Sequence, residues 1–168
     1  MLSRAVSHRS VIVLAAIVVI GAATSRPVAQ SSTPPAIFTS AQAEAGRTAY
    51  ERTCGKCHTP SLLGRKGDPG ELPPITSLSA SYQKFIGPRG VVSPLAGKAF
   101  LDRWGGKTAG ELIARFQETV DDPFFQFEDM HDETTVNITA YVLQVNGAKP
   151  GTQLLTRATG VIVNSTVR

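Results

Sequence analysis

The stretch TCGKCHTP, from Thr53 to Pro60, holds both cysteines of this 168-residue chain and one of its three histidines. Cys54, Cys57 and His58 stand in the spacing C-x-x-C-H. Cysteine and histidine side chains bind transition metals, and cysteine thiols also form covalent bonds. The chemistry of the chain depends on what this motif holds, and the segments on either side of it narrow the choice.

The residues before the motif predict a helix. Thr39 and Gln42 have the spacing of a capping box, and their segment contains four alanines and no proline. We expect the helix to begin just after Thr39 and to run into the cysteines. Gly46, Tyr50 and Cys54 recur at intervals of four, so they share the helix face that leads to the motif.

The residues after the motif predict a long loop. Residues 59–96 are rich in Gly, Pro and Ser, and the clusters GRKGDPGELPP and GPRGVVSP indicate turns. Only one short helix, around Ser79 to Phe85, is expected there. An irregular stretch of this length is uncommon in a compact domain unless something else organises it, and a buried cofactor would do so.

Helices resume in the second half of the chain. GKAFLDRWG predicts a short helix, and TAGELIARFQETV predicts a longer one whose capping box is Thr108 with Glu111. The last helix, DETTVNITAYVLQV, has apolar residues along adjacent faces and ends at Asn146-Gly147. Residues 151–168 are a tail of unassigned structure, although GVIVNSTVR has a strand-like composition. The predicted fold class is therefore all-α.

The first thirty residues predict export. Arg4 and Arg9 precede the apolar run VIVLAAIVVIGAA, which is followed by small, polar and proline-rich residues. This pattern is typical of an export signal, and the run is short for a membrane span of about 20 residues. Two cleavage positions compete, in GAATS and in PVAQS. Residues 1–30 are thus either a cleaved signal peptide or an N-terminal membrane anchor, and the folded part is periplasmic or otherwise exported.

The basic charge of the chain belongs largely to this leader. The leader contains three of the seventeen Lys and Arg residues and none of the thirteen acids, so the remainder carries a net charge of +1. A nucleic-acid partner is therefore not indicated. From Arg47 to Lys107 there are ten basic and four acidic residues, whereas Glu118 to Glu133 has seven acids and no Lys or Arg. The asymmetry is either a solvated surface or a dipole that orients the protein toward a redox partner.

Three interpretations of the motif fit poorly. A zinc site needs about four N or S ligands, and beyond the motif only His131 and carboxylates remain, at no familiar spacing. A thioredoxin-like dithiol lies between a strand and a helix of a βαβ unit, whereas this one ends a helix in a chain without strands. A disulfide between Cys54 and Cys57 would close a very small loop and so constrain little of the unfolded chain.

Covalent haem fits the motif and its setting. Two thiols three positions apart can reach the two vinyl groups of one porphyrin as thioethers, and the adjacent histidine then lies over the iron. The setting adds an export signal, a preceding helix, a long following loop and no other cysteine. The prediction is one haem c attached through Cys54 and Cys57, with His58 as the proximal iron ligand.

With these features, residues 38–150 resemble the class I monohaem cytochrome c family. The likeness lies in Gly46 and Tyr50 ahead of CGKCH, and in AYVLQVNG of the last helix. SPLAGKAFLDRWGGKTAGEL resembles the small cytochromes that are subunits or partners of bacterial dehydrogenases, including quinoprotein ones. The resemblance implies a cytochrome c fold, in which the N- and C-terminal helices cross at Gly46, near Tyr141, around a covalently attached haem with long loops.

The resemblance also implies roles for individual residues around the haem. A backbone carbonyl in the loop around Pro94 would accept the Nδ1 proton of the ligand histidine, although the similar Pro73-Pro74 segment could do the same. Phe100 and Trp104 are either core aromatics or contacts of the haem edge.

The sixth iron ligand is left open among three possibilities. Beyond the initiator, Met130 is the only methionine and so the only thioether available for a His/Met pair. The resemblance, however, places the family's ligand methionine at Asp122, before Pro123. Met130 therefore ligates after a re-routing of the chain, or His131 ligates instead, or the distal position is open.

The predicted function is electron transfer rather than enzymatic catalysis. The chain shows no Ser/His/Asp arrangement, phosphate-binding loop or paired carboxylates that a substrate reaction would need. Its partners would be redox proteins, among them a dehydrogenase, and a membrane would be involved only through a retained anchor. The alternative is a haem protein with an open distal site that acts in ligand sensing or peroxide chemistry.

Overall fold

The computed structural model describes residues 33–65, 73–86, 90–124 and 130–167. The export signal or anchor expected at residues 1–30 lies outside the described residues. In the part that is described, no helix combines the length and the apolar character needed to cross a membrane.

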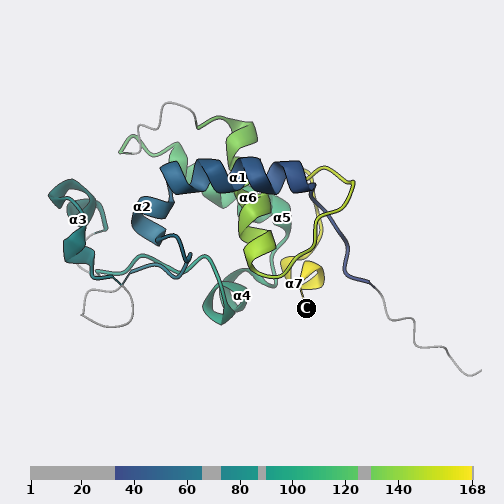
Figure 1. Cartoon of the computed structure of the whole chain (residues 1–168), viewed down its shortest axis with the longest axis horizontal. Coiled ribbons are helices and arrows are strands. Elements are labelled where there is room, and N and C mark those ends of the chain that lie inside the picture. Colours follow the sequence, from purple (N-terminus) through teal and green to yellow (C-terminus); the bar gives the residue numbers. More distant parts are fainter. Residues whose placement is uncertain (1–32, 66–72, 87–89, 125–129, 168) are drawn as a thin grey trace, which may run out of the picture. The chain divides into compact units, whose positions relative to one another are not determined.

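The described residues form helices joined by irregular loops (Figure 1). The longer helices are α1 (Ser40–Arg52), α5 (Ala109–Val120) and α6 (Asp132–Val145), and the shorter ones are α2 (Gly55–His58), η1 (Ile75–Ser77), α3 (Ala80–Ile86), α4 (Lys98–Trp104) and α7 (Val163–Thr166). Pairing between extended segments is limited, within these ranges, to isolated bridges. The all-α prediction is confirmed.

Both expected capping boxes are present. The Thr39 hydroxyl accepts a bond from the Gln42 amide, and the Gln42 side chain accepts one from the Thr39 amide, each 3.2 Å long. Thr108 and Glu111 do the same at the start of α5, at 3.1 and 2.7 Å. Two unpaired amides are satisfied at each helix start, which is why these boundaries follow from the local sequence.

The expectation that the first helix runs into the cysteines is wrong, because the helix stops just before them. α1 ends at Arg52, and Thr53 leaves the helical conformation with φ −122° and ψ −88°. The Thr53 hydroxyl donates to the Ala49 carbonyl over 2.7 Å, and its side chain thereby closes the last turn. The cysteine motif lies on a separate turn, α2, with Cys54 as the residue that precedes its first turn.

α1 crosses α6 at a glycine (Figure 1). Gly46 faces the backbone of Asn137 and Ile138 so closely that a Cβ at position 46 would overlap the Asn137 carbonyl. One turn further along, the Tyr50 and Tyr141 rings meet with centroids 5.4 Å apart. The close crossing therefore lies one turn before Tyr141, and the tyrosine pair packs beside it.

The C-terminal tail, whose structure the sequence does not indicate, packs into the same core. The Gln42 side chain both donates to the Leu155 carbonyl and accepts from the Leu155 amide, at 3.0 Å each. Val163 is fully buried and its amide donates to Lys107, while Ile162 is 42% exposed. Ile162 forms an isolated antiparallel bridge with Thr108, and the Val161 carbonyl accepts from the Ala109 amide. This pairing with the start of α5 accounts for the strand-like composition just before α7.

Candidate cofactor site

The single turn of α2 brings the motif residues together. The His58 amide donates to the Cys54 carbonyl over 2.8 Å, and the Cys57 amide donates to the same oxygen over 3.1 Å. Positions i, i+3 and i+4 of a helical turn share one face, so the two thiols and the imidazole point the same way. Both cysteines are free and half-buried.

These three side chains form one wall of a cavity of about 340 Å³. The rest of the lining comes from the end of α3, from the loop that precedes α4, from α4 and α5, and from Met130 with the first half of α6. Most of the lining is apolar, with two arginines among it: Phe85, Ile86, Val91, Val92, Ser93, Pro94, Leu95, Arg103, Trp104, Arg115, Phe116, Thr119, Val120, Met130, Thr135 and Ile138. A mostly apolar cavity with a few placed polar groups is the usual form of a cofactor site.

His58 is fixed in one tautomer. Its Nδ1 lies 2.8 Å from the Ser93 carbonyl oxygen. A carbonyl can only accept, so Nδ1 carries the proton and Nε2 of the neutral ring keeps its lone pair. Burial lowers the pKa of His58, and the bond to Ser93 only partly opposes this shift, so the neutral imidazole is favoured. The ring is therefore prepared to ligate a metal through Nε2.

The acceptor carbonyl comes from the loop around Pro94. Ser93 directly precedes this proline, whereas Pro74 precedes η1, and its carbonyl accepts a bond of 2.7 Å from the Ser77 hydroxyl. The two segments look alike in sequence, but only one of them contacts the imidazole.

The two cysteines are held as thiols rather than thiolates. Burial raises the pKa of both Cys54 and Cys57, and for Cys57 the positive charges of Arg65 and Lys56 oppose this rise. A thiol can add across a carbon–carbon double bond, with its sulfur bonding to one carbon and its hydrogen to the other. Two neighbouring thiols beside an apolar cavity are therefore suited to the covalent attachment of a group that carries such bonds.

The chain is strained directly after the motif. Thr59 has φ 66° and Leu62 has φ 61°, a left-handed conformation that is costly for a β-branched residue such as threonine. The buried Tyr50 hydroxyl donates to the Thr59 carbonyl over 2.7 Å, and the Thr59 hydroxyl donates to the His58 carbonyl over 2.6 Å. These bonds hold the sharp exit from α2 that turns the loop back toward the imidazole.

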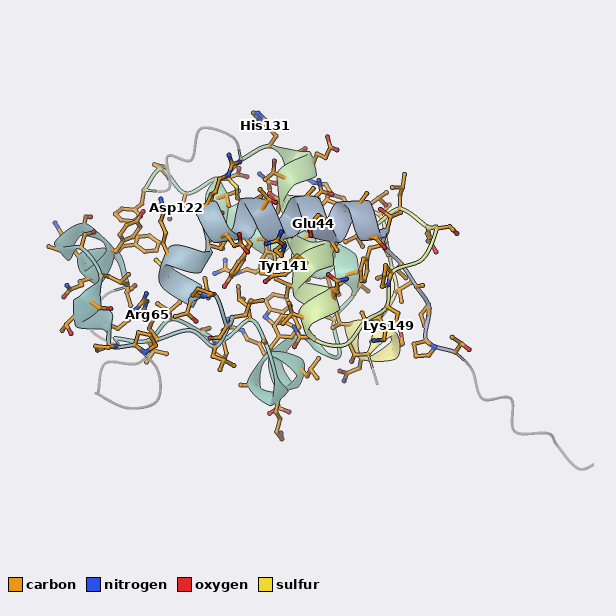
Figure 2. The ribbon with its side chains drawn as sticks, viewed as in Figure 1. Glu44, Arg65, Asp122, His131, Tyr141 and Lys149 are labelled. Atoms are coloured by element: carbon orange, nitrogen blue, oxygen red, sulfur yellow. The ribbon has the colours of Figure 1, made fainter. Side chains whose placement is uncertain are left out.

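Met130 is the candidate distal residue that lines the cavity. It is half-buried and packs against the core. His131 precedes α6, is exposed and projects away from the helices (Figure 2). Asp122 is exposed, and its Oδ1 accepts a bond of 2.9 Å from the Phe124 amide. The structure thus brings Met130, and neither His131 nor Asp122, to the same cavity as His58.

The two aromatic residues of α4 differ in their position. Phe100 is fully buried in the core, whereas Trp104 is half-buried and lines the cavity. The Arg103 guanidinium carbon lies 5.9 Å from the Trp104 ring centre, and Arg103 also lines the cavity.

The sequence resemblance points to the loop around Pro94 but not to Ser93 itself, and nothing in the sequence singles out Arg65. Arg65 donates to the backbone of α2, and Ser93 accepts from His58 across 35 positions of the chain. The serine could have been found as the residue before Pro94. No local sequence pattern indicates Arg65, because its bonds to α2 form only when the loop after the motif folds back against that helix.

In the four described ranges, no three His, Cys, Asp or Glu side chains gather closely enough to hold a metal ion among themselves. Comparisons with known proteins found no match for the chain among family models, curated proteins or solved structures.

Proposed function

We propose that this chain is an exported c-type cytochrome that carries single electrons through one covalently bound haem. The observation that carries the proposal is the cavity that joins Cys54, Cys57 and His58 on one wall with Met130 on another. This set of two thiols, one imidazole and one thioether is what a covalent haem with a His/Met iron requires.

The described residues are suited to hold a covalent haem in three respects. The thiols are free, and they lie on the same face of one helical turn as the histidine. The His58 Nδ1 proton is committed to Ser93, which leaves Nε2 for a metal. The lining is mostly apolar, as a porphyrin face requires, and Arg103 and Arg115 are the cationic exceptions.

We further propose that the helical core has the cytochrome c fold. In support, α1 ends directly before the motif and crosses α6 at Gly46. The loop segments around residues 62 and 95 pair near the motif, with a bond of 2.7 Å from the Leu95 amide to the Leu62 carbonyl. The loop that carries Leu95 forms part of the cavity lining together with the helices.

Bound haem would supply the change between ferric and ferrous iron, and the protein supplies its environment. Cys54 and Cys57 would hold the group covalently. His58 would bind the iron through Nε2 with its ring orientation set by Ser93, and Met130 would supply a second protein ligand. The apolar walls limit water, which sets how strongly each oxidation state is stabilised.

We also propose that the protein is exported, with residues 1–30 either removed or kept as a membrane anchor. Its proposed electron donor or acceptor is a dehydrogenase. Two carboxylates of the acidic stretch form ion pairs with arginines, so the stretch contributes less negative charge to a molecular dipole than its sequence indicates. Glu118 pairs with Arg115 at 3.1 Å, and Asp132 pairs with Arg157 at 2.7 Å. Exposed pairs of this kind are worth little to stability, but they neutralise charge locally.

The test is production of the full chain in a host that exports and matures c-type cytochromes. Its visible spectrum and the retention of haem after acid-acetone extraction are then recorded. We expect retained haem in the parent, and no covalent haem when Cys54→Ala and Cys57→Ala are combined. A double variant that folds normally without colour, beside an equally colourless parent, would refute the cytochrome assignment.

The rate and affinity of carbon monoxide binding distinguish an electron carrier from a haem protein with an open distal site. A thioether-ligated iron should bind the gas slowly or weakly, because Met130 must first leave. Rapid, tight binding by the parent would favour the open-site alternative, which is a ligand sensor or a peroxide-reactive protein.

A further inference from the structure

We propose that Arg65 is a positioning residue for the imidazole of His58, because it joins the end of α2 to the loop that carries the Ser93 carbonyl. The inference rests on the proposed function. It assigns a role in tuning the iron ligand to a residue that lies outside the cavity wall.

The Arg65 side chain holds the end of α2. Its Nε donates to the Cys57 carbonyl and one Nη to the Lys56 carbonyl, each over 3.0 Å. The last carbonyls of a helix have no partner within it, and a cation is favoured there. The second Nη donates to the Ser77 hydroxyl over 2.8 Å, which fixes the far side of the guanidinium. Figure 2 labels Arg65 beside this turn.

The Arg65 backbone holds the acceptor loop. Its amide donates to the Val92 carbonyl over 3.1 Å, and the Val92 amide donates back to the Arg65 carbonyl over 2.9 Å. Val92 is buried, and the next residue is Ser93, whose oxygen accepts the His58 proton. Donor and acceptor of the His58–Ser93 hydrogen bond are therefore both tied to the same residue.

The geometry requires arginine. Three donors on one planar guanidinium reach two carbonyls of α2 and the Ser77 hydroxyl at once, and a lysine ammonium at the end of a flexible stem cannot reproduce this fork. Lysine would keep the positive charge near the motif and lose the alignment. The substitution Arg65→Lys thus separates position from charge.

Weakening of the hydrogen bond between His58 and Ser93 should change the reduction potential of a bound haem iron. The bond from Nδ1 raises the basicity of a ligating imidazole, and a more basic ligand favours ferric iron. Weakening the bond should therefore raise the reduction potential. Arg65→Ala also removes a positive charge, which should lower the potential, so the two variants are expected to differ in direction or in size.

The experiment measures the exchange rate of the His58 Nδ1 proton by NMR of ¹⁵N-histidine-labelled protein, together with the reduction potential. We compare the parent with the variants Arg65→Lys and Arg65→Ala and with the control Arg47→Ala. Arg47 forms exposed ion pairs with Glu44 and Glu51 on α1 and does not line the cavity. We expect exchange about tenfold faster or more in both Arg65 variants, a raised potential in Arg65→Lys, and parent-like values in the control.

Two results would overturn the inference. Exchange within about twofold of the parent in both Arg65 variants would show that the hydrogen bond does not depend on this residue. Parent-like exchange and potential in Arg65→Lys alone would show that only charge matters. If the parent holds no covalent haem, the proposed function fails, while the proton exchange still reports whether Arg65 secures the bond. Should Arg65→Ala fail to fold, Arg65→Lys carries the test.

Discussion

Gly46 of α1 and Asn137 of α6 are in backbone contact, with no room for a side chain between them. A Cβ at position 46 would overlap the Asn137 carbonyl oxygen, and neither helix backbone can yield as the end of a flexible side chain would. This crossing sets how closely the helix that leads to the motif approaches the helix that follows Met130.

Gly46→Ala should lower the free energy of unfolding by about 1–3 kcal/mol, because overpacking forces the helices apart. The higher helix propensity of alanine offsets only about 1 kcal/mol. Chemical denaturation measures the change. Gly106→Ala is the control, since a Cβ there meets nothing within 4 Å. Equal stabilities of parent and Gly46→Ala would mean that the helices can separate at no cost.

The tail should contribute to the stability of the core. Leu155 is 2% exposed, so Leu155→Ala is expected to cost about 2–5 kcal/mol in unfolding free energy. Its neighbour Leu154 is 62% exposed, and Leu154→Ala should change stability by less than about 0.5 kcal/mol. Thermal unfolding of the parent and of the two variants measures both changes in stability. Similar transitions for the two variants would show that the tail can detach without affecting the fold.

The sixth ligand can be identified with two substitutions. Met130→Leu keeps the apolar volume and removes the thioether, so we expect altered absorption and magnetic resonance spectra in both oxidation states and a changed reduction potential. His131→Ala should leave the spectra unchanged, because the exposed histidine does not line the cavity. Unchanged spectra in Met130→Leu would show the His/Met assignment to be wrong. A spectral change in His131→Ala alone would then indicate a bis-histidine iron.

Stability should fall at alkaline pH, partly through Tyr50. Burial is the largest cause that raises the pKa of this phenol above its usual range in the folded protein. The unfolded chain therefore ionises first, at a pH of about 10, and loses protons on unfolding, so the unfolding free energy decreases as the pH rises further.

Tyr50→Phe should show a smaller alkaline loss than the parent when unfolding is followed from neutral pH to above about 10. At neutral pH the substitution should cost about 0.5–1.5 kcal/mol, because the hydrogen bond to Thr59 is lost. Tyr82→Phe on α3 controls for the change of phenol to phenyl. An identical pH profile in parent and Tyr50→Phe would mean that other groups cause the alkaline loss.

The local features of this protein can be predicted from short stretches of its sequence. The starts of α1 and α5 follow from Thr39 with Gln42 and from Thr108 with Glu111, because a capping box is complete within four residues. The spacing of the cysteine motif is likewise local, and one helical turn is enough to place its three side chains on one face. Interactions of such short range depend little on the rest of the chain.

Residues that look alike in sequence are told apart by their long-range contacts in the folded chain. Ser93 rather than the Pro73-Pro74 segment accepts the His58 proton, and Met130 rather than Asp122 lines the cavity. Arg65 had no sequence signal at all. Each of these outcomes depends on the path by which a loop returns to α2, and that path is set by backbone pairing and packing between residues distant in the chain. Local propensities carry no information about it.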